Sequence, residues 1–431
     1  MIKGERVMNG FKKYDIVVVG GGFAGAAAAI AAAREGKSVR LIEKYNCLGG
    51  AACYNMVGPF MKYWVWLTEE KTERKMLSAG IFSEIIDKLT AMNAFKPEKN
   101  LVFNEEYLKL ILNRMATEAG VELLYQTAVV GVKKIGNKIE AVTVSNVSGT
   151  YDIYGDCFID ATGDANLSYM AGVPFRMGRK SDGLCQPMTL CCRVGGVDTE
   201  GYRAIRSEIN ELYRRYQAEG KIQNPRGDVL ILQNIVDGVL HFNTTRVIKM
   251  DPTNIEDVTR AEIIAREQVF EILDFLRDNF EPFKNCTLLS TGMQIGVRES
   301  RQIVGEYTLT REDLLACTKF EDGIAACCYS MDIHSPDGSE TTLHHFKIGE
   351  YYTIPYRTLV PKDSENLLVA GRCLSAEHEA QASARVMATA CTLGEAAGVA
   401  ASVACEDKTA VKDVDVQKVR AILREKGACV D

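Results

Sequence analysis

The stretch "DIVVVGGGFAGAAAAIAAAREG", residues 15–36, decides the fold of this chain. It carries no charged side chain from Ile16 through Ala33, so it reaches the lower limit of the roughly 17–25 apolar residues that a membrane-spanning helix needs. Three consecutive glycines nevertheless interrupt it after a β-branched run, and alanine dominates the residues after the glycines. The pattern therefore predicts a strand, a tight turn and a helix rather than a membrane span.

The composition is that of an ordinary globular protein. Of the 431 residues, 47% are hydrophobic and 25% are charged, and the formal net charge is −6. A chain of this length accommodates two or three structural units. The negative charge argues against a nucleic-acid-binding surface, and no other stretch approaches a membrane span. We expect a soluble protein with small-molecule partners, without nucleic-acid or membrane contacts.

The cysteines indicate the compartment. Fourteen cysteines occur without a regular framework, and no Cys-x-x-Cys motif is present. The vicinal pairs do not have the spacing of a zinc or iron–sulfur site, so we expect buried thiols and no metal. The N-terminal residues contain no compact apolar segment that ends in a cleavage site. A cytoplasmic, reducing location is the expectation.

The first part of the chain has the order of a Rossmann unit. A hydrophobic strand over 14–20, a helix over 23–35 and a second strand over 38–43 predict a right-handed βαβ start. A helical stretch is expected from about Leu67. From 121 to 159, short β-rich runs predict a β-meander that precedes the next parallel strand.

The remainder predicts an α/β fold with an insertion. Residues 176–350 mix strand-like runs with one long helical stretch and contain no nucleotide motif, so we expect an inserted α+β substrate domain. A parallel-strand pattern returns at 365–371, followed by a long helix of small residues. The predicted division is therefore a nucleotide-binding domain built from both ends of the chain, residues 1–175 and 351–431, with the inserted substrate domain at 176–350.

The opening stretch contains a dinucleotide fingerprint, Gly20-x-Gly22-x-x-Gly25, between the strand and the helix. The first glycine allows the turn, the second lets the backbone approach a pyrophosphate, and the third lets helix and strand pack closely. Glu43 lies at the end of the second strand, 23 positions after Gly20, where its carboxylate can accept the ribose hydroxyls. It disfavours a 2′-phosphate, which leaves NAD and FAD open at this point.

Further segments resemble the FAD-dependent oxidoreductases that have a glutathione-reductase-type Rossmann domain. The matching segments are "EKYNCLGGAA", "QTAVVGV", "FIDATGDANLSYMAGVPF" and "NLLVAGRCLSAEHEAQASARVMATACTLGEAAGVAA". The resemblance implies bound FAD, and a helix N-terminus near 383–387 that stabilises negative charge on the reduced flavin. The cofactor-binding residues that it implies are Gly20, Gly22, Gly25, Glu43, Lys44, Gly49, Gly50, Val129, Thr162, Gly163, Asp164, Gly371, Arg372, Arg385 and Met387.

The resemblance narrows to a subgroup marked by "GVRESRQIVGEY" and "IPYRTLVPK". The flavin region is also similar to that of the heterodisulfide reductase flavin subunit. The dense cysteine motifs of the iron–sulfur branches are absent from this sequence, so no cluster is expected. Cys47 and Cys53 lie on either side of the Gly-Gly pair, a spacing that departs from the dithiol of disulfide reductases and does not favour that activity.

Three residues are candidates for the reaction itself. His378 lies between the Gly371 segment and the helix expected near the flavin, so it suits a proton-transfer role, although it also suits a helix cap. His334 is a weaker candidate of the same kind. Arg298 and Arg301 flank Glu299, which indicates either an ion pair at a domain interface or, for Arg298, a clamp on an anionic or carbonyl group of the substrate.

The expected function is hydride transfer between a small organic substrate and bound FAD, followed by exchange of electrons with an unidentified acceptor or donor. Two alternatives stay open at this point. One is a flavin monooxygenase of the hydroxylase type, and the other is a flavin-bearing electron-transfer or binding subunit. A homo-oligomer is compatible with each of them.

Overall fold

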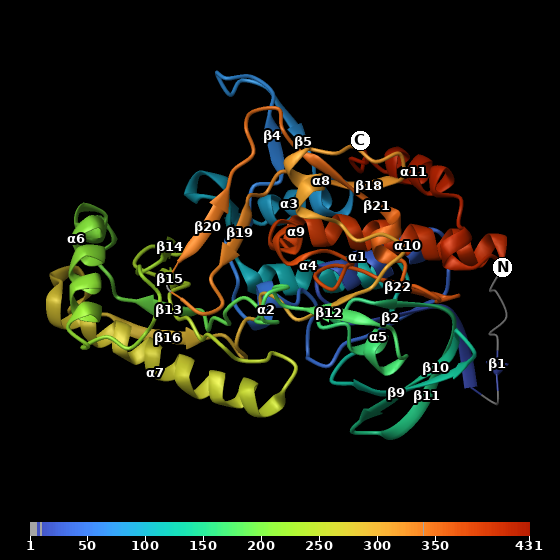
Figure 1. Cartoon of the computed structure of the whole chain (residues 1–431), viewed down its shortest axis with the longest axis horizontal. Coiled ribbons are helices and arrows are strands. Elements are labelled where there is room, and N and C mark those ends of the chain that lie inside the picture. Colours follow the sequence, from blue (N-terminus) through green and yellow to red (C-terminus); the bar gives the residue numbers. More distant parts are fainter. Residues whose placement is uncertain (1–6, 9–10, 339) are drawn as a thin grey trace.

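The structure, a computed structural model, describes residues 7–8, 11–338 and 340–431. Its largest sheet has eight strands, of which six run in the order β8-β3-β2-β11-β10-β9, while β1 pairs with β2 and β22 with β11 (Figure 1). The strands are β1 (Val7–Met8), β2 (Phe11–Val19), β3 (Val39–Ile42), β8 (Glu122–Leu124), β9 (Ala128–Ile135), β10 (Lys138–Asn146), β11 (Gly149–Asp160) and β22 (Leu367–Val369).

The sheet joins a parallel half to an antiparallel meander. β8, β3, β2, β11 and β22 pair in parallel, as the βαβ pattern predicts. β9, β10 and β11 form the expected antiparallel meander, with the turn at 136–137 between β9 and β10. β11 belongs to both halves, because its first residues pair with β10 and its last residues pair with β2 and β22. The predicted α/β fold with a parallel sheet and meander is therefore confirmed in outline.

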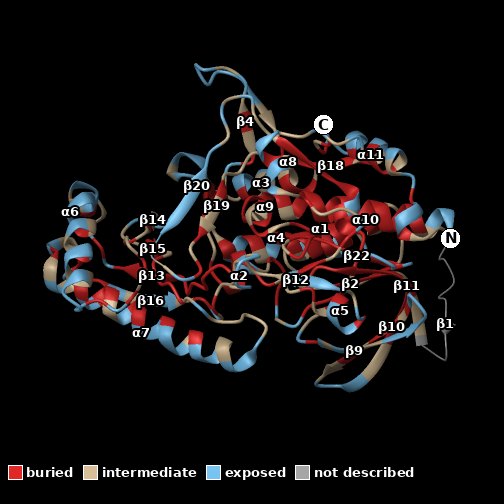
Figure 2. Cartoon of the chain, viewed as in Figure 1, coloured by how far each residue is buried: buried red, intermediate tan, exposed pale blue. Residues whose placement is uncertain are grey.

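The opening stretch forms β2 and α1 (Phe23–Arg34), and both are buried in protein (Figure 2). α1 packs against α10 (Met387–Asp407), the long helix near the other end of the chain. A methyl group on Gly394 would lie 2.0 Å from the carbonyl oxygen of Ala24, and one on Gly398 would lie 2.2 Å from that of Ala28. The small residues of both helices therefore allow their backbones to touch.

In the described part of the chain, α10 is the one helix that is long and apolar enough to cross a membrane. Its most apolar window is 89% buried inside the protein. Its apolar surface therefore belongs to the core that it forms with α1 and the sheet.

Two further helices cover the N-terminal part, α3 (Ile81–Ala91) and α4 (Glu105–Glu118). Asn104 caps α4 by accepting a hydrogen bond from the Glu106 backbone N–H, as its side chain type favours. The prediction of a helix from about Leu67 is wrong. Residues there form the hairpin of β4 (Trp64–Trp66) and β5 (Arg74–Met76), which projects from the body in Figure 1. Farther along the chain, the short strands β6 (Phe95–Lys96) and β7 (Val102–Phe103) pair with each other.

A second core lies in the middle of the chain. Four strands in the order β14-β15-β13-β16 carry the helices α6 and α7, at the left of Figure 1. The elements are β13 (Cys192–Gly195), α6 (Thr199–Ala218), β14 (Ile231–Gln233), β15 (Leu240–Phe242), α7 (Ile255–Asn279) and β16 (Thr287–Thr291). Their buried apolar residues, from Met188 to Ile295, form one cluster, which we call the middle unit.

The predicted boundaries at 176 and 350 stay a prediction, and the apolar residues between them are shared by the two cores. Apolar residues from Ile303 to Tyr356 belong to the main cluster together with α1 and α10. The reason is that these residues pack as short strand pairs against the main body. The pairs are β12 (Phe175–Met177) with β17 (Arg301–Ile303), β18 (Gly323–Cys327) with β21 (Tyr352–Pro355), and β19 (Met331–His334) with β20 (Thr341–His344).

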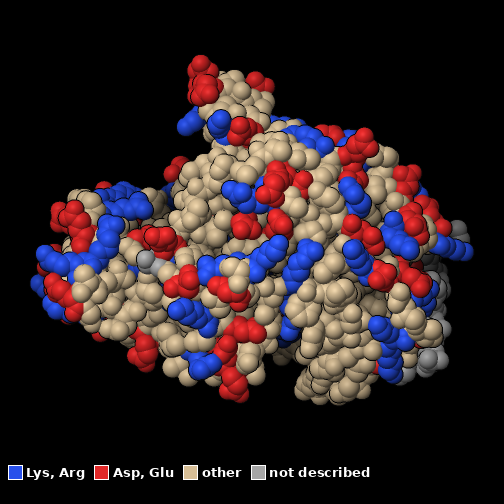
Figure 3. Space-filling model, in the orientation of Figure 1, with Lys and Arg blue, Asp and Glu red and all other residues tan. Residues whose placement is uncertain are grey.

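The other helical elements are short or peripheral. They are α2 (Ala51–Tyr54), α5 (Asn166–Met170), α8 (Arg311–Leu315), α9 (His378–Ala384), α11 (Val416–Glu425) and the 3-10 turns Pro97–Lys99, Glu281–Phe283, Tyr356–Leu359 and Val411–Asp413. On the face seen in Figure 3, basic and acidic side chains are interspersed. That face therefore carries no extended field of one sign.

Candidate active site

A cavity of about 400 Å³ lies where the parallel strands end. Its walls include residues that directly follow β2, β3, β11 and β22, so it opens at the carboxyl edge of the sheet. Ligands of open α/β sheets bind at this edge. Residues of the middle unit and of β19 complete the cavity at its other end.

The cavity walls collect the segments that the sequence singled out. Of the residues predicted to bind the cofactor, all except Gly25 line the cavity. Gly25 instead serves the packing role expected of the third glycine, because a methyl group there would lie 1.7 Å from the Gly20 carbonyl oxygen. Among the three reaction candidates, Arg298 and His334 line the cavity and His378 does not.

The glycine turn leaves room for a ligand at one position only. Gly20 has a φ of +99°, and a methyl group on it would lie 2.5 Å from the Ala161 carbonyl oxygen, so this position requires glycine. A methyl group on Gly22 would meet nothing closer than the Gly50 Cα, at 3.8 Å. This glycine turn, which we call the glycine cradle, is therefore open above Gly22 and beside the N-terminus of α1, as a dinucleotide's phosphates require.

Glu43 closes the cavity at the end of β3. Its side chain is buried, and its Oε2 and Oε1 atoms accept hydrogen bonds from the backbone N–H groups of Gly21 (2.5 Å) and Tyr45 (2.9 Å). Burial raises the pKa of this carboxyl, and those two N–H groups oppose the rise. A carboxylate held in this way keeps free lone pairs for the two hydroxyls of a ribose.

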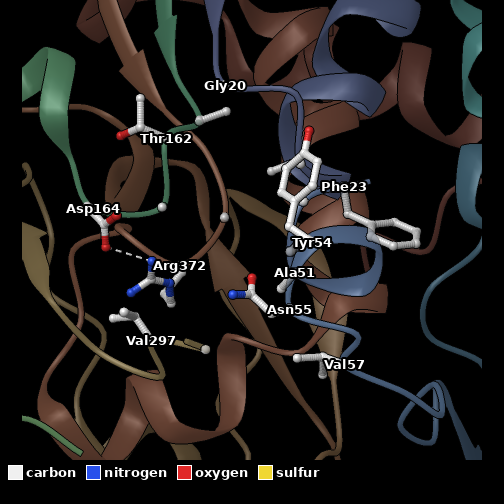
Figure 4. Close-up of a pocket in the computed structure, with 18 of the residues that line it drawn as sticks. Gly20, Phe23, Ala51, Tyr54, Asn55, Val57, Thr162, Asp164, Val297 and Arg372 are labelled. Carbon is white, nitrogen blue, oxygen red and sulfur yellow. Dashed lines mark hydrogen bonds and ion pairs between the residues drawn. The ribbon is translucent and has the colours of Figure 1, made fainter. Parts of the chain in front are cut away.

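A partly buried ion pair joins three distant segments in the cavity wall. An Arg372 Nη2–H donates to Asp164 Oδ1 at 2.7 Å, as Figure 4 shows, and Ser300 Oγ–H donates to the same oxygen at 2.7 Å. Burial acts to raise the pKa of Asp164, but the charge of Arg372 and these hydrogen bonds outweigh it and lower the pKa. Tyr54 and Asn55, from α2 and its end, lie on the other side of the cavity (Figure 4).

The helix expected near the flavin is divided in two. α9 ends at Ala384, and α10 begins at Met387 with Val386 as its N-cap residue. Arg385, Val386 and Met387 all line the cavity, so the N-terminal end of the long helix does face it. This end of α10 carries a partial positive charge that suits an electron-rich ligand.

Glu299 does not form the ion pair that was expected with the flanking arginines. Its carboxylate lies 2.8 Å from Nδ1 of His378, and it also accepts the Gln186 backbone N–H at 2.9 Å. Arg301 instead donates to the Asp164 carbonyl oxygen and lies over the Tyr169 ring, with its guanidinium carbon 4.3 Å from the ring centroid. The predicted ion pair between Glu299 and the two arginines beside it is therefore wrong.

His378 lies behind the cavity wall, at the first position of α9. It is buried beside Glu299, and its Nε2 has no partner among the residues that the structure describes. This placement favours a positioning role, because the ring anchors α9 to the segment around Glu299. The expected proton-transfer role of His378 stays a prediction that the geometry does not favour.

His334 lies at the end of β19 with a fixed tautomer. An Arg246 Nη2–H donates to its Nδ1 at 3.0 Å, and its Nε2 lies 3.5 Å from Asp332 Oδ2. A guanidinium has no acceptor, so Nδ1 must be unprotonated and Nε2 must carry the hydrogen. Burial, aided by the charge of Arg298, lowers the pKa of His334 to about 3. The ring is therefore a neutral donor rather than a proton acceptor.

Several residues at this end of the cavity carry no local signal in the sequence. Asp332 accepts a hydrogen bond from the Tyr329 hydroxyl at 2.9 Å and lies 3.9 Å from Arg385. Burial acts to raise the pKa of Asp332, but hydrogen bonds and the charge of Arg385 lower it well below its usual range. The other residues missed are Thr189, Cys191, Asn243 and Gln294. None of them belongs to a spaced motif, since they meet only through the fold.

The described residues contain no group of three or more His, Cys, Asp or Glu side chains arranged to hold a metal ion. The glycine cradle, the buried Glu43 and the α10 N-terminus instead fit a dinucleotide. The donor set therefore matches an organic cofactor.

Comparisons with known proteins agree with this geometry. The sequence model of a family described as FAD dependent oxidoreductase matches residues 15–423. Digeranylgeranylglycerophospholipid reductase 1 of Methanococcoides burtonii is 30% identical over 165 residues, which cover 37% of this chain and 40% of that protein. An uncharacterized protein from the nifH2 5′ region of Methanosarcina barkeri is 30% identical over 164 residues, 36% of this chain and 84% of that protein.

Solved structures are similar over nearly the whole chain but with low identity. A geranylgeranyl bacteriochlorophyll reductase-like protein from Thermoplasma acidophilum has a TM-score of 0.45 at 14% identity, covering 96% of this chain and 84% of that one. The p-nitrophenol 4-monooxygenase of Pseudomonas putida has a TM-score of 0.45 at 10% identity, covering 97% and 82%.

Proposed function

Because this chain belongs to the family of FAD-dependent oxidoreductases, we propose that it transfers a hydride between a small organic substrate and its FAD. The observation that carries the proposal is the continuity of one cavity. The same cavity is lined by the glycine cradle and Glu43 at one end and by Arg298, Arg385 and His334 at the other. A cofactor and a small polar substrate therefore have adjoining places in it.

The residues that would hold FAD are those of the cradle and the strand end beside it. The turn at Gly22 and the first N–H groups of α1 would bind the pyrophosphate, and Glu43 would accept the ribose hydroxyls. FAD supplies the redox-active ring when bound. The N-terminal end of α10 would stabilise negative charge on that ring, since Val386 and Met387 at this end line the cavity.

Asp332, Tyr329 and His334 would orient the substrate at the other end. The Tyr329 hydroxyl and the Nε2–H of His334 both point to Asp332, so this carboxylate is held ionised and in place. Residues of the middle unit line that end of the cavity beside them. A separate electron acceptor or donor and a cytoplasmic location complete the proposal.

The test is to purify the protein and record its visible spectrum. A yellow flavin spectrum is expected, and the anaerobic addition of metabolites in turn should bleach it with one class of compound. A colourless protein that fails to take up FAD would overturn the proposal. Rapid oxidation of NAD(P)H with oxygen uptake and a hydroxylated product would assign the monooxygenase alternative. Reduction that responds only to a partner protein would assign the electron-transfer alternative.

A further inference from the structure

We propose that the substrate of this cavity carries a carboxylate and that Arg298 binds it, an inference that rests on the proposed function. The starting observation is the surroundings of the Arg298 guanidinium. Its Nη1 donates to the Pro187 carbonyl oxygen at 2.7 Å and to the Thr189 hydroxyl, and its Nη2 lies 3.3 Å from Asn243 Oδ1. All three acceptors are neutral.

Among the residues described, no carboxylate lies within 4.0 Å of the Arg298 guanidinium nitrogens, the limit for an ion pair. Charged groups taken away from bulk water are normally paired, because an uncompensated charge there loses its hydration without a replacement. Burial and the nearby Arg385 lower the pKa of Arg298 to about 9, which still leaves it charged at neutral pH. The side chain is thus a cation without a counter-ion in the wall of the cavity.

The charges of the neighbouring cavity wall do not supply the missing anion. Arg298 and Arg385 are the cations that line this end of the cavity, Arg246 is a third cation buried against His334, and Asp332 is the carboxylate of this end. Asp332 is already shared by Tyr329 and His334 and lies 3.9 Å from Arg385. His334 is neutral, so it adds no charge. This end therefore has an excess of positive charge, which favours an anionic ligand group.

The free edge of Arg298 fits a carboxylate better than a phosphate. Nη1 already donates to two acceptors. Nε has no acceptor among the described residues, and it is not among the fully buried polar atoms that lack a partner. Its N–H is therefore accessible from the cavity. The Nε–H and one Nη2–H lie parallel on one edge of a guanidinium and match the two oxygens of a carboxylate. The ionised Asp332, which lines the same end of the cavity, would repel a doubly charged phosphate more strongly than a carboxylate.

The anion is assigned to the substrate rather than to FAD because of the position in the chain of the residues that accept hydrogen bonds from Arg298. Its three acceptors, at Pro187, Thr189 and Asn243, come from the middle unit or the segment leading into it, and none comes from the glycine cradle. Arg372, in contrast, is bound to Asp164 beside the cradle. Arg298 is therefore positioned by the part of the chain that completes the substrate end.

The experiment uses the FAD-loaded protein. Acetate, lactate and benzoate are titrated against it, each compared with its neutral amide, and binding is followed by calorimetry and by the shift of the flavin absorbance. At least one acid should bind at least about tenfold more tightly than its amide. Arg298→Gln should lose that preference at unchanged FAD content, and Arg298→Lys should restore part of it. Arg357→Gln, at a half-exposed pair with Asp322, is the matched control and should behave as the parent.

Three outcomes would overturn the inference: equal binding of acids and amides, no binding of any acid, or unchanged acid binding by Arg298→Gln. Loss of FAD by Arg298→Gln would also overturn it, because the arginine would then serve the cofactor. These results are distinct from a failure of the proposed function. That failure is a protein without FAD, or one whose FAD no small molecule reduces, whereas the carboxylate test measures binding to the oxidised, loaded protein.

Discussion

Arg246 donates a hydrogen bond to Nδ1 of His334 at 3.0 Å, and this contact decides which ring nitrogen carries the hydrogen. The arginine is itself buried, and its Nη1 donates to the carbonyl oxygens of Gly338 and Glu340, so it cannot move away at little cost. The imidazole is consequently held neutral, with Nε2–H toward Asp332. A histidine that sequence reasoning offers as a base is therefore converted into a hydrogen-bond donor by its surroundings.

The first prediction is that His334 stays neutral between pH 7 and pH 5. Its pKa is lowered from 6.5 to about 3, so the unfolded chain binds a proton in this range and the folded chain does not. The contribution of His334 to stability therefore falls as the pH drops below 6.5. The measurement is nitrogen NMR of protein labelled at histidine, with His334→Gln identifying the signal.

Arg246→Met should raise the pKa of His334 toward its usual value, since it removes a donor and a nearby positive charge. An imidazolium signal from His334 in the parent protein at pH 5.5 would contradict the assignment.

The second prediction concerns the open position in the glycine cradle. Gly22→Ala should fold normally, because its added methyl group meets only the Gly50 Cα at an ordinary contact distance of 3.8 Å. The methyl group should nevertheless occupy the space that the pyrophosphate needs, so FAD content should fall at least about tenfold. The ratio of flavin to protein absorbance measures this.

Gly131→Ala is the control, since the residue lies on β9 outside the cavity and its methyl group would meet Thr143 at 3.5 Å. It should keep both the parent melting temperature and the parent FAD content. Normal FAD content in Gly22→Ala would show that the pyrophosphate does not pass above this residue.

The third prediction is a pH-dependent stability that arises at Glu395 on α10. Burial raises the pKa of this carboxyl from 4.5 to about 7, against the opposing hydrogen bond from the Ile81 backbone N–H. The folded chain then holds the proton more tightly than the unfolded chain. The stabilisation is present below pH 4.5 and is lost as the pH rises through 7, by roughly 3 kcal/mol in total.

Glu395→Gln should therefore be more stable than the parent at pH 8 and similar to it at pH 5. Urea unfolding at the two pH values measures the difference. Glu406→Gln is the control on the same helix, because Glu406 is exposed and paired with Lys418. If the free energies of unfolding of the parent and of Glu395→Gln differed by the same amount at both pH values, a titrating Glu395 would be ruled out.

The fourth prediction tests the contact between α1 and α10. Gly394→Ala would place a methyl group 2.0 Å from the Ala24 carbonyl oxygen, and backbone cannot give way as a flexible side chain can. The two helices must separate, at a cost of about 3 kcal/mol or more. Chemical denaturation of the variant, compared with Gly131→Ala, measures this cost. Stability equal to that of the control would mean that the two helices are farther apart than the structure places them.

Much of the cofactor end could be read from the sequence because its requirements are local. Gly20 must adopt a positive φ, Gly25 must allow the turn beside it, and Glu43 must end the adjacent strand. Each condition restricts the residue type at its own position. The α/β fold, the meander and the long buried helix were predictable from hydrophobic patterns for the same reason.

The substrate end could not be read in this way. Arg298, Glu299 and Arg301 are neighbours in sequence, and alternating charge alone suggested an ion pair among them. In the fold Glu299 pairs with His378, Arg301 with the Asp164 segment, and Arg298 with neutral acceptors. Partners that lie 55 to 137 residues away in the sequence decide these roles, and no spacing within one segment encodes them.

The sequence by itself thus determined a strand–turn–helix cradle, its acidic partner and the family of the cofactor, because glycine geometry and hydrophobic periodicity act over a few residues. Only the tertiary structure decided which charges stay unpaired. It fixed His334 as a neutral donor through Arg246, placed His378 behind the wall, and left Arg298 facing the cavity without a counter-ion. The ionisation and pairing of a side chain depend on burial and on the charges that surround it, and these exist only after the chain has folded.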